Sequence, residues 1–337
     1  IVTMGGWIQT GYHSESNDLF NNRPDRLNLH QAWFFAEKAA VSENGELGFG
    51  WRFDGMYGID SGDTRAFGNT VDAAGNPRGF DNGDNFIRGA DYGWAIPQLY
   101  MEMARGDWSV KVGHFYTLIG YEVVTAPDNF FYSHAMTMYN SEPFTHTGAL
   151  ATYNMTDDTT LYGGYTLGWD TGFDQFEDGG NFLGGFSTPF GANTQMTYIT
   201  TIGDFGARGD DAYSHSFVFD TALTDNLNWV VQSDLLRVGE NGEDNVGLNQ
   251  YLLYDVCDRL ALGTRVEWWK ADEQTGYLPH GGTFPGINGA HSYYGATFGA
   301  NIKPTANLII RPEYRYDWSP ALDYDQGYFG IDMIALY

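Results

Sequence analysis

Arginine and an acidic residue recur two positions apart at several places in this sequence. Residues two apart on a β-strand share one face and lie about 7 Å from each other, so each pair can hold opposite charges side by side. Rings of such fixed charges are one way in which proteins select ions. The positions are Arg52/Asp54, Arg265/Glu267 and Arg311/Glu313, with Arg315 two residues further on.

A second group of charges lies in the stretch 118–146, which carries Glu122, Asp128 and Glu142 but no Lys or Arg. A loop this long inside a compact domain is either functional or evidence against the assignment of strands around it. We expect Glu122 and Asp128 to face the wall arginines across an internal space, while the loop's aromatic residues pack against the interior. The alternative is that the arginines only neutralise neighbouring carboxylates, which stabilises little when the pairs are exposed. The wall arginines are Arg52, Arg265, Arg311 and Arg315, and the loop aromatics are Phe130, Phe131, Tyr132 and Tyr139.

The sequence carries no recognisable catalytic motif. Its eight histidines show no HExxH or comparable zinc spacing, and no GxSxG nucleophile elbow occurs. Ser133 and His134 are adjacent, but neighbours on a strand point to opposite faces, which argues against a nucleophile–base pair. We therefore expect that the protein is not an enzyme.

Two acidic stretches offer oxygen ligands of the kind that Ca²⁺ prefers. Neither follows the EF-hand pattern, so a solvated acidic loop is the simpler interpretation of both. The candidate ligands are Asp81, Asp84 and Asn85 in one stretch, and Glu240, Glu243, Asp244 and Asn245 in the other.

Composition limits what the chain can bind. The formal net charge of −26 over 337 residues argues against nucleic-acid binding, because phosphate contacts need a basic face. Of the 17 basic residues, 13 are arginine, whose planar fork suits fixed carboxylate pairs. The single cysteine, Cys257, cannot form an internal disulfide. Because no linker or shift in composition divides the chain, we expect one domain over residues 1–337.

No stretch predicts a transmembrane helix. The longest uncharged tract, 179–203, is interrupted by Pro189 and many Gly, Thr and Asn residues, so it lacks the roughly 20 apolar residues that a helix needs. The chain starts at Ile1 without the regions of a signal peptide, which has been removed or was never there. If the protein lies in a membrane, it must be a closed β-barrel, in which every backbone group is hydrogen-bonded.

Period-2 alternation of apolar and polar residues predicts strands throughout the chain. Most are close to the 9–11 residues that a tilted strand needs to cross a bilayer. We predict sixteen strands, at 3–12, 27–39, 46–58, 96–105, 108–117, 147–155, 159–168, 181–188, 193–203, 213–222, 227–237, 247–256, 260–270, 292–302, 307–316 and 327–337.

The predicted connections alternate in length. Short turns with Gly, Asn or Asp lie between one set of strands, and longer polar links lie between the other. Short turns at one rim and longer loops at the other, on an even number of antiparallel strands, are typical of bacterial outer-membrane barrels. The longer links are 13–26, 59–95, 118–146, 169–180, 204–212, 238–246, 271–291 and 317–326.

The predicted faces and strand ends agree with a barrel in lipid. In the last strand Phe329, Met333 and Tyr337 share one side and Asp332 lies on the other, as expected for an apolar outside and a polar inside. A β-sandwich would show the same alternation. Aromatic residues near strand ends suggest a girdle at the membrane interfaces: Trp7, Trp108, Trp229, Trp268, Trp318 and Tyr337.

One segment, 111–148, carries a more specific pattern, made of Gly113, Phe115, Thr117, Gly120, Glu122, Asn129, Phe131, Tyr132, Ser133, Pro143, Thr145, His146, Thr147 and Gly148. It resembles the β-barrel porin-2 (OmpL-like) family of outer-membrane proteins. Weaker similarities lie in LNLHQAWFFAEKAA, FDGMYGID and Gly168-Trp169-Asp170, and one departure is His114, where the resemblance implies Lys. The resemblance implies a pore-forming, trimeric barrel of a Gram-negative-type outer membrane.

We therefore predict an all-β fold, a sixteen-stranded antiparallel transmembrane barrel with short periplasmic turns, long extracellular loops and an inward-folded constriction loop at about 118–146. Its predicted function is passive diffusion of ions and small hydrophilic solutes, with a mild preference for cations and no cofactor. Its expected partners are outer-membrane lipid and lipopolysaccharide, and we hypothesise that its acidic outer loops bind divalent ions that bridge lipopolysaccharide or neighbouring surface proteins.

Two alternatives remain open on the sequence. The first is a soluble, acidic, aromatic-rich β-protein that binds or cleaves carbohydrate, and it would purify without detergent. The second is a non-porous structural barrel, which swelling of liposomes in sugars of graded size would separate from a porin.

Overall fold

Sixteen antiparallel strands form one closed sheet in which each strand pairs with its neighbours in sequence. The computed structural model describes residues 1–16, 20–69, 80–81, 92–173, 179–240, 242–271 and 291–337. The strands are β1 (Thr3–His13), β2 (Asn28–Lys38), β3 (Gly48–Gly58), β4 (Gly93–Arg105), β5 (Trp108–Tyr116), β6 (Thr145–Asn154), β7 (Thr160–Thr166), β8 (Gly180–Pro189), β9 (Thr194–Asp204), β10 (Ala212–Thr224), β11 (Leu227–Val238), β12 (Glu243–Cys257), β13 (Leu260–Ala271), β14 (His291–Thr305), β15 (Leu308–Ser319) and β16 (Tyr324–Leu336). The predicted number of strands and the predicted fold class are confirmed.

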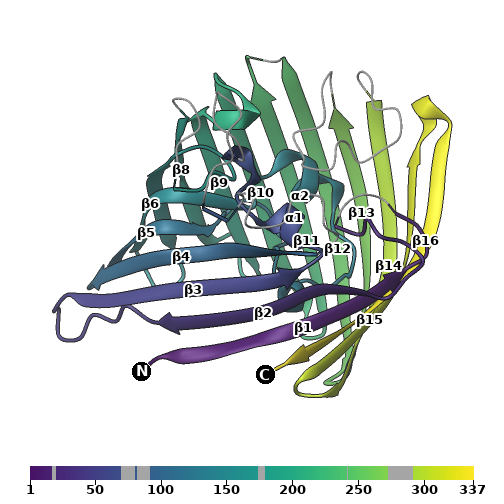
Figure 1. The fold of residues 1–337 in the computed structure, drawn as a ribbon, viewed down its shortest axis with the longest axis horizontal. Helices are drawn as coiled ribbons and strands as arrows, with labels where there is room; N and C mark the ends of the chain where they lie inside the picture. Colours follow the sequence, from purple (N-terminus) through teal and green to yellow (C-terminus); the bar gives the residue numbers. More distant parts are fainter. Residues whose placement is uncertain (17–19, 70–79, 82–91, 174–178, 241, 272–290) are drawn as a thin grey trace.

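The first and last strands close the barrel. β1 pairs with β16 from Trp7 opposite Leu336 to His13 opposite Gly330, and the backbone amide of Tyr337 donates a hydrogen bond to the carbonyl of Gly6. Both termini therefore lie at the same rim, as Figure 1 shows. Closure removes the free sheet edges, which in lipid would leave backbone groups without partners.

The connections follow the predicted alternation only in part. The rim that carries the termini has tight turns such as Gly106-Asp107, where a positive φ at Gly106 suits a glycine. The longest connection in the described residues, 117–144, lies at the other rim, close to the predicted 118–146. The links 239–242 and 320–323 at that rim are shorter than predicted, because their flanking strands extend further. The predicted links 59–95, 169–180 and 271–291 lie partly or almost wholly outside the described residues.

The strand faces alternate as predicted. On β15 Arg311, Glu313 and Arg315 point inward and are buried, whereas Tyr314 and Tyr316 point outward and are exposed. On β16 Phe329, Met333 and Tyr337 are exposed and Asp332 is buried. This is the arrangement that lipid outside and a polar interior require.

The aromatic girdle includes most but not all of its predicted members. Trp108, Trp229 and Tyr337 are exposed on the outer surface, and Trp268 and Trp318 are half-buried. Trp7 was assigned wrongly: it points inward, where it stacks on Trp33 with ring centroids 4.7 Å apart. Its indole N–H donates to Gln31 Oε1 at 2.9 Å, and such a buried polar partner favours the inward position.

The interior holds the short helices and the core. In Figure 1 α1 (Ser61–Thr64) and α2 (Met136–Ser141) lie within the ring of strands, and no helix of the described residues is long and apolar enough to span a membrane. The 3₁₀ turns are Phe67–Asn69, Ala126–Asp128, Gly206–Arg208 and Pro320–Leu322. The largest apolar cluster joins Trp33 and Ile334 of the wall to Ala126, Met136 and Tyr139 of the 117–144 connection. This connection, called the inner loop below, therefore fills much of the barrel interior.

Candidate functional site

The inner loop is bound to the barrel wall through its own backbone carbonyls. The guanidinium of Arg311 on β15 donates from Nη1 to the carbonyls of Ala126 at 2.9 Å, Asn129 at 2.7 Å and Phe131 at 3.0 Å. Arg315, four residues further along the same face of β15, donates from Nη1 to the carbonyl of His134 at 2.5 Å. An arginine fork is suited to such multiple, fixed donation.

Wall carboxylates bind the backbone amides of the same segment. Glu313, between the two arginines, accepts hydrogen bonds from the amides of Tyr132 at 2.8 Å and Ser133 at 3.0 Å. Glu267 on β13 accepts from the amide of Met136 at 2.7 Å. The Arg–acid alternation along the wall thus matches the alternation of C=O and N–H groups along the loop. We call this set of contacts the backbone clamp.

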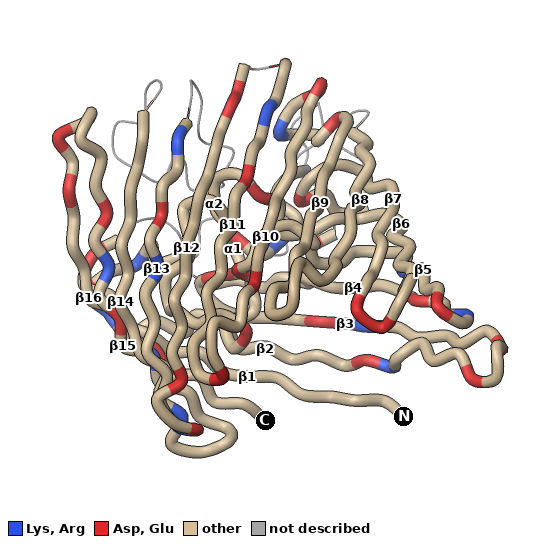
Figure 2. Tube along the Cα trace, turned by 180° about the vertical axis from the view of Figure 1, so that it is seen from behind, with Lys and Arg blue, Asp and Glu red and all other residues tan. Residues whose placement is uncertain are grey.

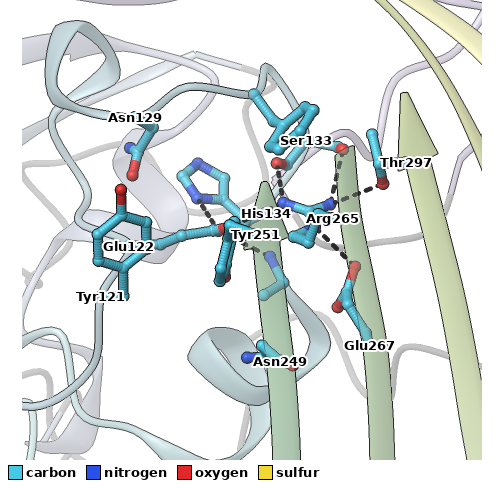
Figure 3. Close-up of polar contacts among 12 residues, drawn as sticks. Tyr121, Glu122, Asn129, Ser133, His134, Asn249, Tyr251, Arg265, Glu267 and Thr297 are labelled. Atoms are coloured by element: carbon cyan, nitrogen blue, oxygen red, sulfur yellow. Dashed lines mark hydrogen bonds and ion pairs between the residues drawn. The ribbon is translucent and has the colours of Figure 1, made fainter. Parts of the chain in front are cut away.

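Arg265 on β13 joins the backbone clamp to acids of both the loop and the wall (Figure 3). It is fully buried and forms ion pairs with Glu122 of the loop at 2.6 Å and Glu267 at 2.8 Å. It also donates to the carbonyl and hydroxyl of Ser133 and to the hydroxyl of Thr297. Charge-assisted hydrogen bonds of this kind are about twice as strong as neutral ones.

Glu122 is held in its charged form by these partners. Burial alone would raise its pKa, but the Arg265 guanidinium, His134 and the amide of Ala135 outweigh burial and lower the pKa to about 2. The Ala135 amide and the Tyr251 hydroxyl donate to its two oxygens at 2.8 and 3.0 Å. The carboxylate is therefore ionised near neutral pH.

Glycines of the wall provide space for the side chains of the inner loop. A Cβ on Gly11 of β1 would lie 2.6 Å from the Tyr132 hydroxyl, and one on Gly330 of β16 would lie 2.9 Å from the Tyr132 ring. The same relation joins Gly263 to Phe130, Gly299 to Phe131, Gly295 to Met136 and Gly247 to Thr137. Glycine at these inward positions lets the loop approach the wall closely.

The hydroxyl of Tyr132 is fixed by a buried polar chain. It lies 2.5 Å from His30 Nε2 and 3.2 Å from His13 Nδ1, and His30 Nδ1 lies 2.8 Å from Asp60 Oδ1. This chain ties the tip of the inner loop to β1 and β2, on the side of the barrel where β15 and β16 meet β1.

At the other end of the inner loop, Arg208 donates from Nη2 to the carbonyl of Asn140 at 2.7 Å, but the inward residues of β11 include no arginine. Glu142 Oε1 accepts a hydrogen bond from Gln232 Nε2 of β11 at 2.5 Å, and the same amide nitrogen donates to Asp234 Oδ2 at 2.6 Å. Burial, followed by repulsion from Asp234 and Glu122, raises the pKa of Glu142 well above 4.5. A bridging amide thus holds two buried carboxyl groups next to each other.

The predicted site residues fall into three places. Arg265, Glu267, Arg311, Glu313, Arg315 and Glu122 all belong to the backbone clamp. Arg52 is partly exposed and pairs with Asp54 at 2.7 Å and Glu37 at 3.0 Å on β3 and β2. Asp128 is exposed on the loop and accepts a hydrogen bond from Thr125. The structure differs from the expected layout in that Glu122 and the arginines of β13 and β15 touch directly instead of facing each other across a space.

Sequence reasoning missed several residues of the backbone clamp. Arg311 pairs with Asp332 of β16 instead of Glu313, because Arg311 and Asp332 lie directly opposite each other in the sheet. Asp317, which pairs with Arg315 at 2.7 Å, was detectable from the same Arg-x-acid spacing. The glycines that face the inner loop gave no signal, because their role depends on which strand position the loop crosses.

The calcium candidates are only partly visible. Asp84 and Asn85 lie outside the described residues, and Asp81 accepts hydrogen bonds from the amides of Ala66 and Ile96. In the second group Glu243 pairs with Arg208 and Asp244 with Arg237. Within the described part of the chain no group of three or more His, Cys, Asp or Glu residues could hold a metal ion.

A closed sixteen-stranded barrel with an apolar outside, a charged inside and a loop folded into it defines a channel-forming protein of bacterial outer membranes. The description of the family model that matches residues 1–333 is putative beta-barrel porin-2, OmpL-like, and the chain belongs to this family. No curated protein sequence matches the chain.

Solved porin structures share the fold at low sequence identity. DcaP, an outer membrane channel of Acinetobacter baumannii, superposes with a TM-score of 0.64 and 10% identity, over 100% of this chain and 97% of that chain. An anion-selective porin from Comamonas acidovorans gives 0.65 and 9%, over 100% and 99%. The trimer form of OmpT from Vibrio cholerae gives 0.61 and 12%, over 100% and 99%.

The protein is therefore an outer-membrane channel of a Gram-negative bacterium that allows passive diffusion, and it is not an enzyme. Membership of this porin family argues against both alternatives that the sequence left open, the soluble carbohydrate-acting protein and the non-porous barrel.

Proposed function

We propose that the inner loop forms the constriction of the channel and that the path past it prefers cations mildly. The observation that carries this proposal is the pairing of the wall cations. Arg265, Arg311 and Arg315 are each buried against at least one carboxylate, and even the partly exposed Arg52 has two acidic partners. Little positive charge is then left to attract anions.

Negative charge, in contrast, remains accessible. Asp128 is exposed on the inner loop, and the chain as a whole carries 43 acidic against 17 basic residues. In Figure 2 most of the coloured positions are acidic. Exposed fixed charges raise the local concentration of counter-ions, and this effect weakens with ionic strength.

The fold does not decide the selectivity, since the similar Comamonas protein is described as an anion-selective porin. Reversal potentials in planar bilayers under a KCl gradient test the proposal. We expect a modest preference for K⁺ over Cl⁻ at low salt that fades as the Debye length falls to about 8 Å at physiological salt. Asp128→Asn should reduce the preference, and Asp157→Asn, in a turn at the opposite rim, should not. A preference for Cl⁻ in the wild-type protein would refute the proposal.

We further propose a homotrimer in contact with outer-membrane lipid and lipopolysaccharide, with small hydrophilic solutes as cargo. Support comes from the apolar outer surface and from the trimer form of the structurally similar OmpT. Native mass spectrometry from detergent tests the oligomeric state, and a monomer in mild detergent would contradict it.

A further inference from the structure

The inner loop encloses a cavity between its first part, 117–124, and its last part, 138–144. The cavity has a volume of about 160 Å³, and because a single water needs about 10–15 Å³, it has room for a small organic molecule. It is partly open to its surroundings, and it is lined by Tyr116, Thr117, Leu118, Ile119, Gly120, Glu122, Val123, Val124, Met138, Glu142, Pro143 and Phe144.

One carboxylate oxygen in this cavity lacks a partner. Glu142 is 5% exposed, and its Oε1 is bound by Gln232, but its Oε2 has no hydrogen-bond partner in the described structure. A Cβ built on Gly120 would overlap this Oε2, and Gly120 and Glu142 both line the cavity. The free oxygen therefore lies at the cavity surface. A buried acceptor without a donor is unfavourable by about 1–3 kcal/mol, so a donor entering the cavity is favoured.

The ionisable neighbours of Glu142 are acids. Asp234 shares the amide of Gln232 with it, and Asp234 Oδ1 also has no hydrogen-bond partner in the described structure. The positive charge nearest to the other cavity acid, Glu122, is the Arg265 guanidinium, which is already shared with Glu267. When both acids at the Gln232 amide are ionised they repel each other, so the empty site holds a proton. A cation that enters the cavity can replace this proton, whereas an anion is excluded.

The remaining lining indicates what kind of cation fits. The Tyr116 hydroxyl has no hydrogen-bond partner in the described structure and can accept one, and the rings of Tyr116 and Phe144 can attract a cation through their faces. Leu118, Val124 and Met138 supply apolar surface. A metal ion such as Ca²⁺ needs six to eight oxygen ligands, and no group of acidic or histidine side chains in the described residues provides them.

We propose that this cavity is a binding site for a small alkylammonium ion. Its ammonium group donates to Glu142 Oε2, and its alkyl chain contacts Leu118, Val124 and Met138. Permeation past the site rests on the proposed function, in which the inner loop lies in the path of the solute, whereas binding itself does not.

Calorimetric titration of the detergent-solubilised protein with n-butylammonium chloride tests binding directly. The wild-type protein should bind n-butylammonium and should not bind n-butanol, which has a similar shape but no charge. Glu142→Gln keeps the shape of the side chain and should weaken binding roughly tenfold or more, the size of one lost hydrogen bond to a charged group. Asp157→Asn, in the turn between β6 and β7, should leave it unchanged.

Equal affinity of the wild-type protein and Glu142→Gln, or no binding at all, would overturn the proposal. A bilayer measurement separates this failure from a failure of the proposed function. If the site lies in the path, n-butylammonium should reduce the K⁺ current of the wild-type channel and leave that of Glu142→Gln nearly unchanged. Binding without any effect on the current would support the site and overturn the constriction, whereas cation selectivity without binding would overturn the site alone.

Discussion

Glu122 and Glu142 belong to the same loop and are almost equally buried, at 7% and 5% exposure, but the walls beside them differ. The wall at Glu122 presents Arg265, which forms an ion pair with it. The wall at Glu142 presents Gln232 and another acid, Asp234. One end of the inner loop is therefore held by compensated charge, and at the other end two acids lie beside each other without a cationic partner.

The difference follows from the inward positions of three strands. β13 supplies Arg265 beside Glu267, and β15 alternates Arg311 and Arg315 with Glu313 and Asp317 on its inward side. β11 supplies Val230, Gln232, Asp234 and Leu236 at the equivalent inward positions. The backbone clamp is therefore built mainly from β13 and β15, with Arg208 binding the Asn140 carbonyl near the other end of the loop. β11 instead places Asp234 beside Glu142, with no arginine at its inward positions. We infer that the wall formed by β13 and β15 holds the inner loop, and that the wall at β11 contacts solutes.

The largest effect on stability is expected from removing Arg265, the central cation of the backbone clamp. Arg265→Met leaves Glu122 and Glu267 without their shared partner and the Ser133 carbonyl without its donor. Removing one member of a buried ion pair is expected to destabilise by about 3–5 kcal/mol. Urea unfolding in detergent measures this loss, and single-channel recording should show a noisier and larger conductance as the loop detaches.

Arg52→Met is the matched control, because Arg52 also has two acidic partners but is partly exposed and lies outside the clamp. It should cost clearly less stability and leave the current noise unchanged. Equal effects of the two substitutions would show that the backbone clamp has no special role.

A second test uses pH, because the two acids predict opposite trends. The folded-state pKa of Glu122, about 2, lies below its ordinary value of 4.5. Its contribution to the free energy of unfolding is therefore complete above about pH 4.5 and is lost as the pH falls toward 2. The shift corresponds to about 3 kcal/mol. The folded-state pKa of Glu142 lies above 4.5, so its contribution is present below that pH and is lost as the pH rises through the folded-state value.

We expect the urea midpoint of Glu122→Gln to fall less than that of the wild-type protein as the pH is lowered toward 2. The midpoint of Glu142→Gln should fall less than that of the wild-type protein as the pH rises. The groups that act on Glu122 are Arg265, His134 and the Ala135 amide, and those that act on Glu142 are Asp234, Glu122 and Gln232. Parallel pH profiles for the two variants would mean that the two walls do not differ electrostatically.

The barrel could be predicted from the sequence because its signals are local. Alternation with period 2 and turn residues gave all sixteen strands and the inward side of Arg265, Arg311 and Asp332. Partner choice could not be predicted, since Arg311 meets Asp332 only through the register of β15 against β16. The inward side of Trp7 depends on Gln31 of the neighbouring strand. The difference between the walls at Glu122 and Glu142 requires knowing which strands the loop crosses.

The smallest effect on stability is expected for an ion pair that is exposed and does not contact the inner loop. Arg237 and Asp244 form an ion pair on the β11–β12 hairpin, and the Arg237 side chain is 63% exposed. Water screens such a pair and the two side chains lose conformational freedom on pairing, so exposed pairs often contribute nothing measurable. Arg237→Met should leave the urea midpoint and the conductance at their wild-type values. If it instead lowered the midpoint as much as Arg265→Met does, pairing of arginine anywhere in the barrel would stabilise it, and the contrast between a compensated and an uncompensated wall would lose its physical basis.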